Sequence, residues 1–139
     1  MSQTPPRPQA LRRPLSPHLQ VWRWHITMFA SILNRVTGVG TVAGFIAVAA
    51  WLVCLALGPE AYTPFMMYGK SPLGLLVWFG LSLSAFVHLM GGVRHLIWDT
   101  GAGFTPKAAD QLALWTMLIG VALTVAFWAI LFATGKVIL

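Results

Sequence analysis

Residues 71–99 read SPLGLLVWFGLSLSAFVHLMGGVRHLIWD, and this stretch decides the fold. It holds no charged residue before Arg94, so it is long and apolar enough for a helix that crosses a bilayer, which takes about 20 residues. His88 lies well inside this run. An ionisable side chain at that depth is costly and usually marks a functional site. Its helical neighbours Ser84 and Gly92 are small, which would let a flat macrocycle approach the imidazole.

Two further stretches of similar character flank this one, because residues 36–59 and 111–135 also contain no charged side chain. Of the 139 residues, 58% are hydrophobic and 9% are charged, whereas soluble domains carry about 25% charged residues. Lipid offers no partner to backbone polar groups, and the alternation typical of barrel strands is absent, so we expect helices. The sequence predicts an all-α integral membrane protein, one domain spanning 1–139 with helices at about 28–57, 72–98 and 109–135.

The charge distribution predicts how the chain crosses the membrane. Four arginines precede the first span without any acidic residue, whereas the loop at 58–70 holds only Glu60 and Lys70. By the positive-inside rule the N-terminus is cytoplasmic and the 58–70 loop lies outside. Residues 1–25 contain several prolines and no apolar core, so we expect an extended cytoplasmic arm rather than a cleaved signal. The net charge of +6 therefore indicates topology rather than nucleic-acid binding.

Ser84, His88, Gly92 and His95 follow a 4-4-3 spacing and share one helical face. The two histidines are about 10.5 Å apart along the axis, too far for one iron to bind both. No other histidine lies within a span, so a second axial ligand would come from another polypeptide. Two alternatives stay open at this point: a hydrogen bond from His88 to a neighbouring helix, or a role in a proton or ion path.

Ser31 and Arg35 share a face near the cytoplasmic end of the first helix. Both can donate hydrogen bonds to a carbonyl or carboxylate, such as a quinone head group or a haem propionate. The alternative is that Arg35 extends to lipid phosphates. The second spanning helix returns to the same side, so we expect Arg94 and His95 in this shallow layer, above the deeper His88.

Three motifs point to a known family: RPLSPHL at 13–19, SILNR at 31–35 followed by Thr37 and Gly38, and HLMGGVRHLIWD at 88–99. Together they closely resemble the cytochrome b membrane-anchor subunit of succinate dehydrogenase, respiratory complex II. The resemblance is collinear from residue 13 to about 105, and the third helix agrees in length and character only. One departure is Asn34, because the family often has histidine immediately before this arginine.

The resemblance implies one haem b held jointly with a second small three-helix anchor subunit. His88 would be one axial ligand of the haem iron, and the partner would supply the other axial histidine. Ser31 and Arg35 match the family's ubiquinone-site serine and arginine. Arg35, Arg94 and His95 are candidates for contact with the haem propionates or for support of the ligand.

The resemblance also implies an iron–sulfur subunit near the quinone and a flavoprotein subunit that oxidises succinate. We therefore expect a subunit of succinate:ubiquinone oxidoreductase that has no catalytic residue of its own and catalyses nothing alone. The expected location is a bacterial inner membrane, in preference to a mitochondrial one. The alternatives are an anchor of quinol:fumarate reductase and a non-redox scaffold or transporter subunit.

Overall fold

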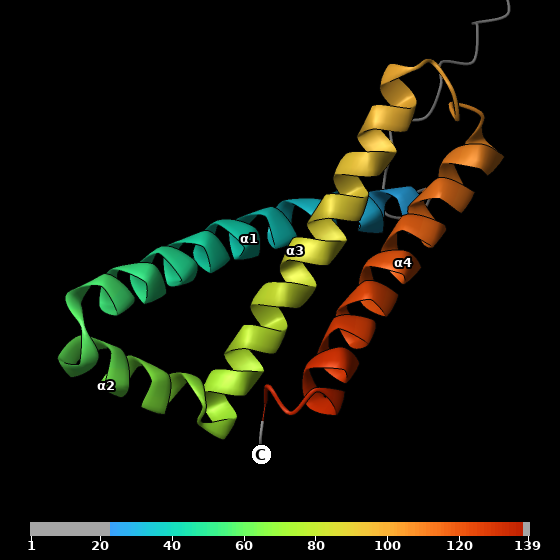
Figure 1. Ribbon diagram of the computed structural model, residues 1–139. Coiled ribbons are helices and arrows are strands. Elements are labelled where there is room, and N and C mark those ends of the chain that lie inside the picture. The colour runs from blue at the N-terminus through green and yellow to red at the C-terminus, as the bar shows by residue number, and fades with distance from the viewer. Residues whose placement is uncertain (1–22, 138–139) are drawn as a thin grey trace, which may run out of the picture.

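The computed structural model describes residues 23–137, so most of the expected N-terminal arm lies outside the described residues. Within that range the chain forms four helices and no strand. In chain order they are α1 (Ile26–Leu57), α2 (Pro59–Gly69), α3 (Pro72–Asp99) and α4 (Pro106–Ala133) (Figure 1). By length and composition α1, α3 and α4 are able to cross a membrane. The predicted all-α class with three membrane-spanning helices is confirmed.

The ends of the long helices follow local sequence signals. Helix α1 stops where Gly58 adopts φ +95°, a conformation that favours glycine. The hydroxyl of Ser71 accepts a hydrogen bond from the Gly74 N–H (3.1 Å) and caps the start of α3. Helix α3 ends at Asp99, two residues before Gly101, whose φ is +81°. The predicted break at residues 99–101 is therefore confirmed.

Helix α2 replaces the loop expected at 58–70. Pro59 occupies its first turn together with Glu60, and both residue types favour a helix start. Its 11 residues are too few to span a bilayer, and Pro64 lies inside it. Helix α4 also starts earlier than expected, at Pro106, because the Thr105 hydroxyl accepts from the N–H of Ala108 (3.4 Å).

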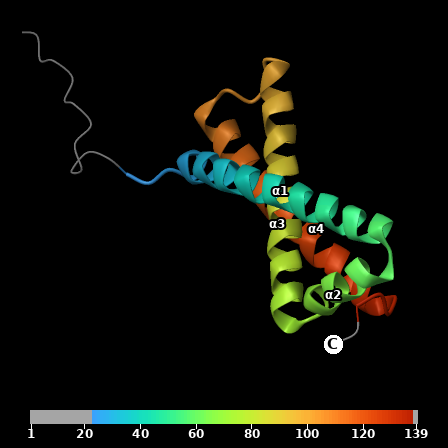
Figure 2. The ribbon, with the colours of Figure 1, turned by 90° about the vertical axis from the view of Figure 1, so that its left-hand side faces the viewer.

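Helices α3 and α4 run side by side, whereas α1 crosses α3 steeply and diverges from α4 towards α2 (Figures 1 and 2). The α3–α4 contact is close, since a Cβ built on Gly120 would lie 2.8 Å from the Cα of Val87. Trp128 of α4 donates from Nε1 to the hydroxyl of Ser82 on α3, at 2.8 Å. A cavity lies at the α2 end of the molecule, where α1 diverges from α4.

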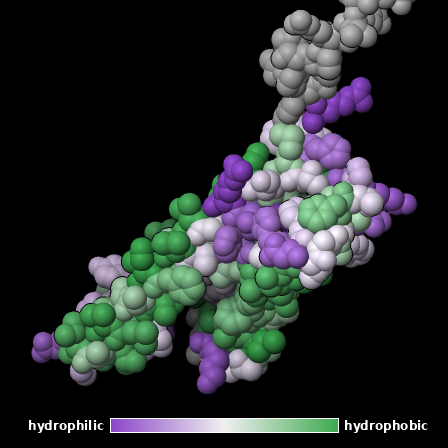
Figure 3. All heavy atoms as spheres, turned by 90° about the horizontal axis from the view of Figure 1, so that it is seen from above, coloured by the Kyte–Doolittle hydropathy of each residue, from purple (hydrophilic) through white to green (hydrophobic). Residues whose placement is uncertain are grey.

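Few side chains are buried, and the three long helices are apolar around most of their circumference. Val39 and Phe45 of α1, for example, are 74% and 71% exposed. Apolar helices with such surfaces are expected to face lipid or other membrane subunits. Seen from above, hydrophilic residues gather mainly where α1 begins, α3 ends and α4 begins (Figure 3). At this polar end the Nδ1 of His25 lies 3.2 Å from a carboxylate oxygen of Asp110, which joins α1 to α4.

Candidate functional site

His88 projects from α3 onto α1, where its Nδ1 lies 3.0 Å from the main-chain oxygen of Asn34. A carbonyl oxygen only accepts hydrogen bonds, so Nδ1 is the donor and Nε2 is the ring nitrogen left free of this bond. Metal-binding histidines usually donate their other ring N–H in this way, which fixes the tautomer and the orientation of the ring. The imidazole of His88 is half-buried.

Gly38 makes room for the His88 ring on the side of α1. A Cβ on Gly38 would lie 3.1 Å from Cε1 of His88, so the imidazole rests directly against the backbone of α1. One turn along α3 from His88, Gly92 is exposed, and a Cβ there would meet nothing within 4 Å. Gly40 of α1 similarly contacts Ser84 of α3. The Ser84 side of His88 therefore packs against α1, whereas the Gly92 side is open.

Ser31 and Arg35 lie one turn apart on α1, towards the polar end. Arg35 is exposed and Ser31 is half-buried. Within residues 23–137 neither side chain forms a hydrogen bond or an ion pair with another residue. Arg35 is also one turn from Gly38, the residue against which His88 packs. The structure therefore packs the predicted haem ligand, on α3, against α1 within one turn of Arg35.

The side chains of Arg94 and His95 lie in different environments. Arg94 is only 3% exposed, and its guanidinium carbon lies 5.3 Å from the centre of the Trp98 ring. It faces a small cavity of about 10 Å³ among residues of α1, α3 and α4. His95 is exposed and meets the Trp98 ring edge-on, with 5.3 Å between ring centroids. Arg94 thus belongs to the helix packing, whereas His95 lies on the open surface.

Asn34 is a site residue whose position the sequence did not predict. Its side chain lies across Gly91 of α3, at a point where any Cβ would collide with the amide oxygen. That oxygen and the Nε of Arg94 are both buried without a hydrogen-bond partner in the described part of the chain, and both residues line the small cavity. The sequence signal for this close contact was the Gly91–Gly92 pair, because glycine inside a helix is unfavourable unless a neighbour approaches closely.

The side chains of the described residues do not assemble a conventional metal site. Between residues 23 and 137, no three residues among His, Cys, Asp and Glu come together in a way that could hold a metal ion. His88 therefore stands as a single candidate ligand.

Comparison with known proteins shows the family of this chain. A sequence model of the family described as succinate dehydrogenase/fumarate reductase transmembrane subunit matches residues 9–128. The chain is 37% identical over 99 residues to the succinate dehydrogenase cytochrome b556 subunit of Paracoccus denitrificans, covering 71% of this chain and 76% of that protein. It is 31% identical over 117 residues to the same-named subunit of Rickettsia felis, covering 84% of this chain and 91% of that protein.

A mitochondrial relative is similar to a comparable degree. The succinate dehydrogenase cytochrome b560 subunit of Sus scrofa is 32% identical over 114 residues, which cover 78% of this chain and 66% of that protein. Relatives thus occur in bacteria and in mitochondria. The chain belongs to the succinate dehydrogenase/fumarate reductase transmembrane subunit family, among the cytochrome b anchor subunits of complex II.

Proposed function

We propose that this chain anchors a succinate:ubiquinone oxidoreductase in the membrane and that His88 is an axial ligand of a haem b. The observation that carries this proposal is the hydrogen bond from His88 Nδ1 to the Asn34 carbonyl oxygen, which leaves Nε2 as the basic nitrogen. The names of the relatives, cytochrome b556 and cytochrome b560, agree with a b-type haem. When bound, this group supplies a one-electron redox centre within the membrane.

The second axial histidine comes from a second small three-helix anchor subunit. His95 is seven residues from His88 on the same helix and cannot reach the opposite face of a flat ring held at His88. His25 lies at the polar end beside Asp110. The exposed surface around Gly92 is the place where the ring and the partner would approach. Arg35 and His95, both exposed, are suited to meet the propionates, whereas Arg94 supports the helix packing behind them.

Ser31 and Arg35 form this chain's part of the ubiquinone site. Arg35 is a fixed cation that stabilises negative charge as it develops on a quinone oxygen, and the Ser31 hydroxyl donates to a carbonyl oxygen. Both lie near the polar end of the molecule, where water can deliver protons to a reduced quinone. The iron–sulfur subunit docks at this end, and the flavoprotein subunit attached to it oxidises succinate. The N-terminus is cytoplasmic in a bacterial inner membrane.

The test is a reduced-minus-oxidised optical spectrum of the complex purified through this chain, for wild type, His88→Ala and His95→Ala. We expect a b-type spectrum in the wild type and in His95→Ala, and none in His88→Ala while the iron–sulfur subunit still co-purifies. Added imidazole should restore the signal in His88→Ala, because it can occupy the vacated ligand position. An unchanged spectrum in His88→Ala, or a wild-type complex without haem, would contradict the proposal.

A further inference from the structure

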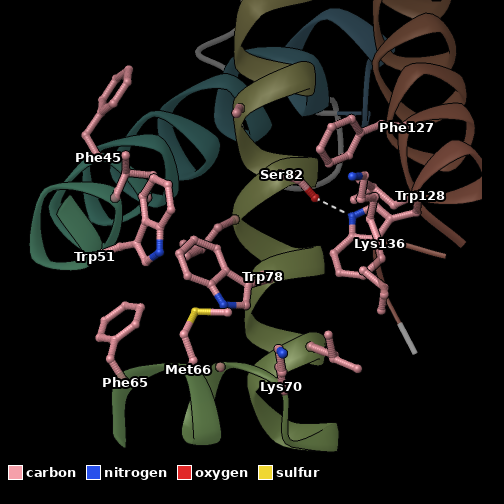
Figure 4. Close-up of a pocket in the computed structure, with 18 of the residues that line it drawn as sticks. Phe45, Trp51, Phe65, Met66, Lys70, Trp78, Ser82, Phe127, Trp128 and Lys136 are labelled. Atoms are coloured by element: carbon pink, nitrogen blue, oxygen red, sulfur yellow. Dashed lines mark hydrogen bonds between the residues drawn. The ribbon is translucent and has the colours of Figure 1, made fainter. Parts of the chain in front are cut away.

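A cavity of about 840 Å³ lies between the second half of α1, α2, the beginning of α3 and the end of α4 (Figure 4). It is formed by the divergence of α1 from α4. None of Ser31, Arg35 and His88 lines it, so it is separate from the proposed haem and quinone site. Its volume is within the range of about 300–1,000 Å³ that is usual for ligand sites. Most of its lining is aromatic or aliphatic, including Trp51, Trp78 and Trp128.

Two cations lie among these apolar side chains. Lys70 follows α2 and Lys136 follows α4, and both are among the lining residues shown in Figure 4. They belong to the end of the molecule at which α3 begins and α4 ends, opposite the polar end that carries Arg35. Among the described residues, no Asp or Glu lines the cavity. Neither lysine forms an ion pair with any of residues 23–137.

We infer that this cavity binds an anionic phospholipid, with the acyl chains along the aromatic walls and the phosphate at Lys70 and Lys136. The charge pattern selects this occupant, because two lysines without acidic neighbours complement a negative head group at the membrane surface. A quinone ring is neutral and would leave both cations uncompensated. An apolar helix of a partner subunit would also leave both lysines uncompensated, and it would bury their charges at a cost in free energy.

The lysines are expected to determine which lipid binds, and the apolar walls are expected to determine whether any lipid binds. Each lysine near an anionic head group contributes about fivefold to binding. Removing both should therefore reduce the preference for anionic over zwitterionic lipid by roughly 25-fold. Ala85 is an exposed lining residue, so a large side chain there should occupy the space of the acyl chains.

The experiment uses the whole complex, delipidated in detergent and then titrated with phosphatidylglycerol or phosphatidylcholine, with bound lipid counted by native mass spectrometry. The variants are Lys70→Gln combined with Lys136→Gln, and Ala85→Phe. The matched controls are Lys107→Gln, an exposed lysine at the other end of α4, and Ala43→Phe, an exposed alanine of α1 outside the cavity.

We expect wild type and both controls to retain one phosphatidylglycerol with a clear preference over phosphatidylcholine. The double lysine variant should lose that preference, and Ala85→Phe should lose both lipids. An unchanged preference in the double lysine variant would overturn the inference, as would full lipid retention in Ala85→Phe. Displacement of the bound lipid by an equal concentration of ubiquinone would also overturn it, because the cavity would then be a quinone site.

Discussion

The Nδ1 of His88 donates to the main-chain oxygen of Asn34 at 3.0 Å, and Asn34 immediately precedes Arg35 in α1. The peptide segment that orients the proposed iron ligand is therefore continuous with the one that carries the proposed quinone cation. A helix backbone is stiff over one turn, so displacement of α1 would move both groups together. This shared turn is the structural link between the proposed haem ligand and the proposed quinone site.

Gly38→Ala should weaken haem binding without removing the ligand. Its Cβ would lie 3.1 Å from Cε1 of His88, so the ring must shift by a few tenths of an ångström, which should disturb its hydrogen bond to Asn34. Loss of such a supporting contact costs roughly 10- to 100-fold in metal affinity. The measurement is the rate of haem loss from the purified complex to an excess of apomyoglobin. Gly80→Ala is the control, because nothing lies within 4 Å of its Cβ; equal rates in the two variants would refute the expectation.

Arg35→Gln should impair quinone reduction and leave succinate oxidation intact. A hydrogen bond to a charged group contributes about 1.5–3 kcal/mol, so kcat/KM for ubiquinone should fall roughly 10- to 100-fold. Ser31→Ala removes a neutral hydroxyl and should cost only about fivefold. Both are measured with a short-chain ubiquinone, and a soluble artificial acceptor that bypasses the membrane serves as the control. Wild-type quinone kinetics in Arg35→Gln would exclude it from the site.

Asn34→Asp tests whether Arg94 and the Asn34 amide share one electrostatic environment. Both line the same small cavity, and each has a buried polar atom without a partner within residues 23–137. A carboxylate beside the buried guanidinium gains a counter-ion and should be tolerated. In an Arg94→Met background the same carboxylate is uncompensated, which typically costs 3–5 kcal/mol. We expect the double variant to lower the apparent melting temperature of the complex by far more than the sum of the decreases in the two single variants. Simple additivity of these decreases would mean that the two side chains are independent.

Gly120→Ala should destabilise the α3–α4 contact more than Ser82→Ala does. The added Cβ would lie 2.8 Å from the Cα of Val87, so the two backbones must separate, and such overpacking typically costs about 1–3 kcal/mol. Ser82→Ala removes one interhelical hydrogen bond from Trp128, and in membranes such bonds average about 0.6 kcal/mol. Heat inactivation of the complex would rank the two variants, and the reverse order would show that the hydrogen bond dominates.

The fold was predictable where a local pattern suffices. An uncharged run of sufficient length predicts a spanning helix because hydrocarbon excludes charge and requires internal backbone hydrogen bonds. The termini at Ser71 and Gly101 follow from capping and turn chemistry in the same way. Helix α2 was missed because its 11 residues, with Pro64 among them, carry neither a spanning pattern nor a clear amphipathic one.

By itself the sequence determined the class of protein, the three spanning helices and the interior position of His88, since each depends on the cost of polar groups in lipid. Only the tertiary structure decided what His88, Asn34 and Arg94 touch. The sequence could place Arg94 beside His95 in one shallow layer, but the steep crossing of α1 over α3 buries the first and exposes the second. Crossing angle and register arise from contacts between residues far apart in the chain, such as Asn34 with Gly91, and no local pattern encodes them.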